Sequence, residues 1–138
     1  MALSNLMVEL FEKMSSWEAE VVRGAGLSLP HMHAVEIIGN HGRLIMKDLA
    51  SLVGVTTGTM TFTVDKLEEK GLIERFPNPD DRRSTIIGLT EKGKRLHSIH
   101  TRAHEDMTRQ SLQGFTAEEE SVMEDLVGRF LKNFPEPK

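Results

Sequence analysis

The chain has 138 residues, of which 38% are hydrophobic and 28% charged, and its formal net charge is −4. These values predict one globular domain with its own hydrophobic core and argue against a disordered chain. The lack of cysteine excludes disulfides and thiolate metal ligands. No stretch approaches the roughly 20 apolar residues of a membrane span, so we expect a cytoplasmic protein without a membrane partner.

The first half of the sequence predicts four helices. Apolar residues recur at helical spacing and indicate a first helix over about residues 3–25. Ser28 is expected to cap a second helix, with Pro30 in its first turn and Gly39–Gly42 at its end. Residues 46–71 then read as two short helices separated by "VGV".

The second half predicts a hairpin and two more helices. The strands "LIERF" and "STIIGL" flank "PNPDDRR", whose proline, asparagine and aspartates favour a turn. Thr90 is expected to cap a long helix that ends near Leu112, and Thr116 with Glu119 forms a capping box for the last helix. The fold class predicted is therefore mainly α (α+β).

The two short helices have the pattern of a helix-turn-helix, in which Gly54 makes the turn and the second helix buries Met60, Val64 and Leu67. Threonine hydroxyls on its other face suit phosphate oxygens, and their methyl groups suit thymine. No Arg, Asn or Gln lies near the start of this helix, so we expect specificity from DNA shape and methyl contacts. The residues predicted to bind DNA here are Thr56, Thr57, Gly58, Thr59, Thr61, Phe62 and Lys66.

A hairpin directly after a helix-turn-helix is a wing, and its tip carries Arg82 and Arg83. Arginine at a wing tip can enter a narrow minor groove, where the potential is most negative. Asp80 or Asp81 is expected to hold one arginine while the other reaches out. The alternative is a self-neutralised surface turn. The position after a helix-turn-helix, in a segment with ten basic against eight acidic residues from Arg43 to Arg95, favours DNA binding.

"LEEKGLIER", "PDDRR" and "LTEKGK" follow one another at the spacing of the MarR family, which this chain resembles. The resemblance implies a single domain over residues 1–138, with a winged helix-turn-helix at about 30–89 and dimerisation helices at about 3–25 and 90–134. It implies a sequence-specific transcriptional regulator that binds double-stranded DNA as a homodimer on a pseudo-palindromic operator, and we expect a repressor. It also implies a small-molecule or metal effector.

Three of the six histidines, His97, His100 and His104, fall within an arc of roughly 60° on one helix. An i,i+4 pair such as His100 and His104 can share a metal ion. The alternative is that these are exposed or interface histidines.

The metal-responsive branch of the MarR family adds to such a pair a histidine near the start of the second helix and a glutamate from the first. That resemblance implies a site for Zn²⁺ or another divalent transition metal, built from His100, His104, His33 and either Glu18 or Glu20.

Other readings remain open. A phenolic or lipophilic effector could bind in a pocket lined by Met14, Trp17, Met32 and Met107, because methionine adapts to varied shapes. An enzyme is not expected, and no catalytic residue is predicted. The chain has no cysteine nucleophile, no Gly-x-Ser-x-Gly and no phosphate-binding glycine loop. A metal-dependent hydrolase and a scaffold that does not bind DNA are distant alternatives.

Overall fold

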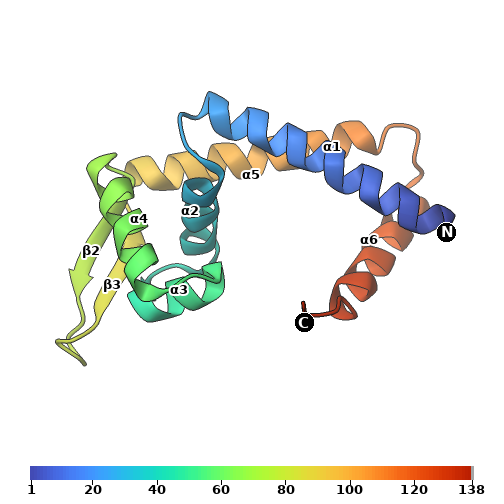
Figure 1. Cartoon of the computed structure of the whole chain (residues 1–138). Coiled ribbons are helices and arrows are strands. Elements are labelled where there is room, and N and C mark those ends of the chain that lie inside the picture. The colour runs from blue at the N-terminus through green and yellow to red at the C-terminus, as the bar shows by residue number, and fades with distance from the viewer. Residues whose placement is uncertain (138) are drawn as a thin grey trace. The chain divides into compact units, whose positions relative to one another are not determined.

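The computed structural model describes residues 1–137, which divide into two compact units, one from Met1 to His100 and one from Thr101 onward. The mainly α prediction is confirmed (Figure 1). None of the described helices is long and apolar enough to cross a membrane. The elements are α1 (Ala2–Gly24), α2 (Leu29–His41), β1 (Leu44–Ile45), α3 (Met46–Val53), α4 (Thr57–Glu69), β2 (Ile73–Pro77), β3 (Thr85–Leu89), α5 (Glu91–Ser111) and α6 (Ala117–Lys132).

The predicted helix caps are confirmed. The side chain of Ser28 accepts a hydrogen bond from the amide of His31 at the start of α2. Thr90 Oγ1 accepts one from Gly93 N at 3.0 Å at the start of α5. The capping box of α6 forms through Thr116 and its partner three residues on. These short-range bonds satisfy amides that have no acceptor within their own helix, which is why local sequence locates these helix starts.

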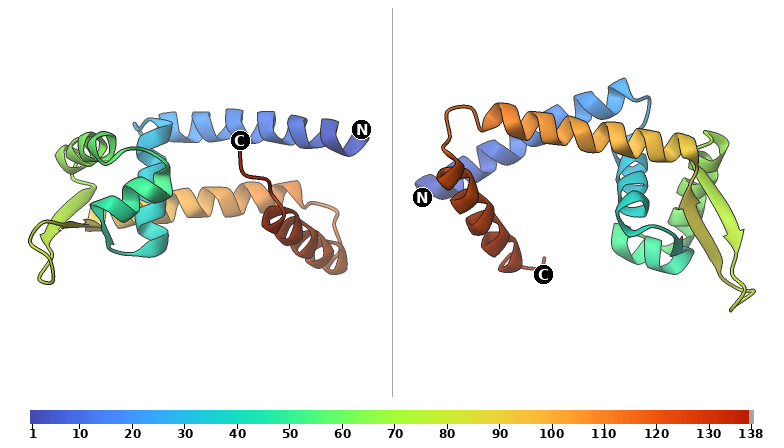
Figure 2. Two further views of the ribbon diagram at one scale, coloured as in Figure 1. Left: turned by 60° about the horizontal axis from the view of Figure 1, so that its bottom comes forward. Right: turned by 180° about the vertical axis from the view of Figure 1, so that it is seen from behind.

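A three-stranded antiparallel sheet of order β1-β3-β2 completes the first unit. The β2–β3 hairpin is the predicted wing, and it projects past α3 and α4 (Figure 2). β1, which pairs Leu44 with Ile87 and Ile45 with Ile86, was not predicted. Two residues are too few to show the alternation that identifies a strand in a sequence.

The core of the first unit lies among α2, α3, α4 and the sheet. The inward positions predicted for α4 are confirmed, since Met60, Val64 and Leu67 are at most 2% exposed. With its inner face fixed in this way, α4 must present its other face to solvent.

Of the glycines in this unit, Gly93 has the nearest neighbouring backbone. A Cβ there would lie 2.1 Å from the carbonyl oxygen of Leu72, which itself accepts a hydrogen bond from Thr90 N. We expect Gly93→Ala to lower the free energy of unfolding by about 1–3 kcal/mol, because backbone must move to relieve the overlap. Gly58→Ala is the control, since a Cβ there meets nothing within 4 Å and should stabilise α4 by up to about 1 kcal/mol. Urea unfolding that shows equal stability for the two variants would contradict this.

Candidate functional site

The turn between α3 and α4 orients the exposed helix. Gly54 adopts a left-handed conformation with φ 84°, and its amide and that of Val55 both donate to the carbonyl of Ala50 at 2.9 and 3.0 Å. Thr56 follows as N-cap and accepts from Thr59 N at 3.2 Å. This short connection is the predicted helix-turn-helix, and it fixes the start of α4 at the surface.

The outer face of α4 is solvent-exposed along its length. Thr61 Oγ1 donates to the carbonyl of Thr57 at 2.8 Å, which leaves its oxygen lone pairs available as acceptors. Phe62 is 64% exposed, and Lys66 Nζ lies 5.4 Å from its ring centroid. The exposed residues on this helix and its cap include all those predicted for DNA contact: Thr56, Thr57, Gly58, Thr59, Thr61, Phe62 and Lys66.

Backbone contacts shape the wing tip and leave its arginines in solvent. Asn78 Oδ1 accepts from Asp80 N at 3.0 Å, and Asp81 Oδ1 accepts from Arg83 N at 2.9 Å. The Arg83 side chain is 97% exposed, and its Nε is 3.9 Å from Asp81 Oδ1. Arg82 forms no ion pair with any residue from 1 to 137. Of the two acids, Asp81 therefore contributes its carboxylate to the backbone of the turn, and its nearest approach to an arginine side chain is the longer contact with Arg83.

A third arginine near this face was not singled out from the sequence. Arg75 on β2 pairs with Asp65 and, at 2.6 Å from Nη1 to Oε1, with Glu68, both on α4. The hydrogen bond to Asp65 is the main cause that raises the pKa of Arg75. Asp65 lies ten residues and Glu68 seven residues before Arg75, across the corner between α4 and β2, and such separations leave no periodic signal in the sequence.

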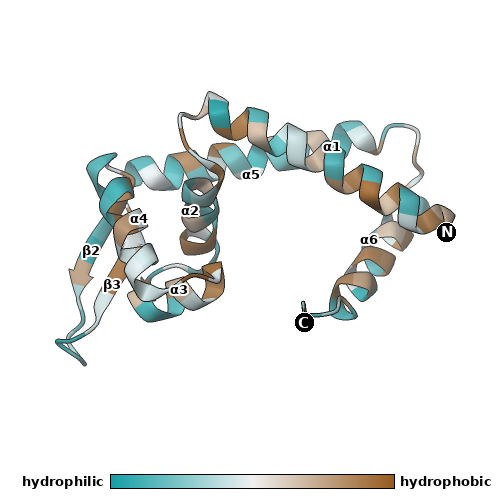
Figure 3. Cartoon of the chain, in the orientation of Figure 1, coloured by the Kyte–Doolittle hydropathy of each residue, from teal (hydrophilic) through white to brown (hydrophobic). Residues whose placement is uncertain are grey.

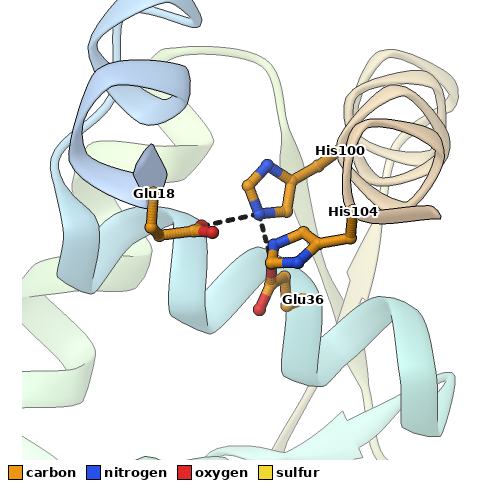
Figure 4. A group of neighbouring side chains, drawn as sticks. All are labelled: Glu18, Glu36, His100 and His104. Atoms are coloured by element: carbon orange, nitrogen blue, oxygen red, sulfur yellow. Dashed lines mark ion pairs between the residues drawn. The ribbon is translucent and has the colours of Figure 1, made fainter. Parts of the chain in front are cut away.

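Two carboxylates meet the buried imidazole of His100. His100 Nε2 lies 2.7 Å from Glu18 Oε1 of α1 and 2.5 Å from Glu36 Oε1 of α2 (Figure 4). His104 follows one turn later on the same helix, and one ligand atom from each of the four residues lies within 4.8 Å of the others. Between the two glutamates that the sequence left open, the structure places Glu18 in this group, whereas Glu20 is exposed.

The structure does not place His33 in this group. His33 is exposed, and Glu36, three residues later on α2, lies against His100 instead. Glu36 was missed because its role depends on how α2 is rotated against α5, a long-range contact. The sequence signal that could have identified Glu36 is its i,i+3 spacing from His33, because residues three apart lie on the same face of a helix.

The remaining histidines have local partners or surroundings. His41 Nδ1 lies 2.9 Å from the carbonyl of Ile37, and His97 Nε2 lies 2.9 Å from Asn40 Oδ1. Burial lowers the pKa of His31, and the nearby Lys70 and Lys66 lower it further.

The donors of the four-residue group, which we call the Glu–His cluster, fit a divalent transition metal. Two carboxylates and two imidazoles suit Zn²⁺, and bonds of about 2.0–2.1 Å put neighbouring tetrahedral ligands about 3.3 Å apart. The two carboxylate oxygens are at hydrogen-bond distance from His100 Nε2. Each oxygen would therefore have to move away from His100 Nε2 by roughly half an ångström or more to admit an ion.

The predicted organic pocket finds less support. Met32 is 1% exposed within the core of the first unit, and Met14 is 42% exposed on α1. Two cavities of the first unit, of about 540 and 590 Å³, are lined by other residues, Phe76 and Lys94 in one and Lys70 and Ile99 in the other.

Comparisons with known proteins agree with these features. A model of the MarR family matches residues 27–85. YfiV, an uncharacterized HTH-type transcriptional regulator of Bacillus subtilis (strain 168), is 30% identical over 111 residues, which cover 78% of this chain and 69% of the relative. YybA of the same organism, also described as an uncharacterized HTH-type transcriptional regulator, is 32% identical over 103 residues, covering 75% and 68%.

Solved structures give the same answer. FabT of Streptococcus pneumoniae, solved in complex with DNA, is 28% identical with a TM-score of 0.81, and the match covers 95% of this chain and 94% of that one. A MarR family protein from Bacillus stearothermophilus has a TM-score of 0.86 over 95% and 91% of the two chains, and at 21% identity it supports the fold. The chain therefore belongs to the MarR family of transcriptional regulators, as its motifs predicted.

Proposed function

We propose that the chain is a sequence-specific DNA-binding repressor that acts as a homodimer on a pseudo-palindromic operator. The observation that carries the proposal lies within the first unit, where the exposed face of α4 adjoins a wing whose tip holds two solvent-exposed arginines. The same face exposes Phe62, whose ring is 64% accessible to a ligand. DNA is the ligand that uses all three features.

Each element has a distinct part in this proposal. The start of α4 presents unpaired backbone amides and threonine hydroxyls to phosphates, and its methyl groups and Phe62 to thymine methyls in the major groove. The wing arginines enter the adjacent minor groove, where Arg82 makes contacts that no carboxylate of the wing competes for. The DNA complex of the related FabT supports this use of the fold.

Apolar stripes on α1 and α6 support the homodimer (Figure 3). On α1, Leu6, Leu10 and Phe11 are between 48% and 70% exposed. On α6 no residue is buried, and it exposes a series of large apolar side chains: Val122, Met123, Leu126, Val127, Phe130 and Leu131. An amphipathic helix that buries nothing within its own chain needs a partner surface. A second copy of the chain supplies one, and it brings two α4 helices to the two halves of a palindrome.

The effector that the geometry favours is Zn²⁺ or another divalent transition metal, held by Glu18, Glu36, His100 and His104. When bound, the ion would place a double positive charge beside the Glu18 and Glu36 carboxylates, and it would link α1, α2 and α5. Because α2 belongs to the core that carries α4, this link would change DNA affinity by the coupling free energy between the two sites. We propose no enzymatic activity.

Selection of genomic fragments by the purified full chain, followed by footprinting, tests this function. We expect one protected region with two half-sites about 10 base pairs or a multiple apart, and sedimentation at the mass of two chains. Leu126→Asp should sediment as a single chain and lose cooperative protection of both half-sites. The absence of any selected fragment at low salt, where phosphate contacts are strongest, would contradict DNA binding.

A further inference from the structure

The helix face that we propose for DNA carries two acids. Asp65 follows Thr57 and Thr61 at i+4 steps, so the three residues lie on one exposed stripe of α4. The side chains of Asp65 and Glu68 are 52% and 43% exposed. Carboxylates on such a face repel phosphates, and like charges brought together weaken an interface. A helix used for DNA needs something that offsets them.

Arg75 supplies this offset from the wing. Each of its two terminal nitrogens contacts a different carboxylate, Nη1 that of Glu68 at 2.6 Å and Nη2 that of Asp65. The Arg75 side chain is 29% exposed, less than either acid. Arginine suits this task because its planar fork can hold two acceptors at once and it keeps its charge at any physiological pH.

We propose that Arg75 is a positioning residue for DNA recognition, which neutralises Asp65 and Glu68 so that α4 can approach the phosphate backbone. Arg75 need not touch DNA. It also ties β2, the strand that leads to the wing tip, to the side of α4. This inference rests on the proposed DNA-binding function and adds to it a reason why an acidic stripe is compatible with that function.

Removal and repair of the charge test the inference. Without Arg75 the two acids are uncompensated and repel the phosphates, so we expect Arg75→Ala to weaken fragment binding about tenfold or more. Adding Asp65→Asn and Glu68→Gln to Arg75→Ala should restore affinity to within about threefold of the unmodified protein. Arg23→Ala, which removes an exposed arginine at the end of α1, controls for the loss of one positive charge.

Two results would overturn the proposal. One is an Arg75→Ala variant that binds as well as Arg23→Ala, and the other is a triple variant that stays as weak as Arg75→Ala. A purely structural role would give the second result, since the triple variant also lacks the tie to β2.

A measurement without DNA separates this inference from the proposed function. Hydrogen–deuterium exchange of the β2 amides should be faster in Arg75→Ala than in Arg23→Ala, because β2 has lost its link to α4. Equal exchange would refute the link whatever the DNA result. Failure of the unmodified protein to bind any fragment would instead count against the proposed function, with the exchange result still deciding whether Arg75 holds β2.

Discussion

Replacing Arg82 and Arg83 together by alanine should weaken operator binding by about thirtyfold or more, because each groove contact by arginine contributes about 1–3 kcal/mol. The salt dependence should fall as well, with the slope of log K against log salt reduced by about 2 in magnitude. Titration of a labelled operator at several salt concentrations measures both quantities. The free energy of unfolding should change by less than about 0.5 kcal/mol, since both side chains are exposed.

The matched control is the double variant Arg23→Ala and Arg95→Ala, which removes two exposed arginines outside the wing and α4. It has the same net charge as the wing variant, so any difference in affinity reports where the arginines are and not how many there are. If both double variants bind equally, the wing does not contact DNA. In that case the tip is the self-neutralised turn that the sequence left open.

Zinc should stabilise the folded protein through the Glu–His cluster. At a free Zn²⁺ concentration of 100 times the Kd, we expect about 2.7 kcal/mol of added stability, which corresponds to a rise in Tm of about 10 °C for a domain of this size. The same concentration should change operator affinity, because one ligand lies on α2, in the core that carries α4, and the others lie on α1 and α5. Thermal melts and fragment titrations of chelator-treated protein, with and without Zn²⁺, check both effects.

Variants of α2 make this test specific. Glu36→Gln should lose most of the zinc-dependent rise in Tm, because the neutral amide is a much poorer ligand than the carboxylate. His33→Gln should keep it, since His33 is exposed and lies outside the cluster. The opposite outcome would support the ligand set implied by the family pattern, and an unchanged Tm in the parent protein would exclude zinc as the effector. Glu18→Gln and Glu20→Gln form the same comparison on α1.

What could be predicted from the sequence was mostly local. Three helices begin directly after a threonine whose hydroxyl oxygen accepts a hydrogen bond from an amide of the first turn: Thr56, Thr90 and Thr116. A few neighbouring residues therefore determine each helix start. The inward face of α4 followed from spacing alone. The face left exposed was therefore also predictable, and the threonine stripe with it.

Contacts between distant elements could not be predicted in the same way. Glu36 and His33 lie on the same helix, and only the packing of α2 against α5 decides which one meets His100. Arg75 joins two acids of α4 because the chain reverses at Gly71 and brings β2 alongside that helix. Neither the contact of Glu36 with His100 nor that of Arg75 with α4 produces a periodic pattern in the sequence, since each depends on how one element is rotated against another.

The backbone contact at Gly93 has a mechanical consequence. The start of α5 rests directly on the carbonyl of Leu72, and the Thr90 hydroxyl donates to the carbonyl of Gly71 at 2.5 Å. A contact between two stretches of backbone has no side-chain rotamer through which it can adjust, so we expect this end of α5 to move together with Leu72. His100 lies about 10 Å further along the helix at 1.5 Å per residue. We therefore expect a displacement of α5 at His100 to turn the helix about Gly93. That rotation would shift Gly71 and Leu72, the residues that lead into β2 and the wing.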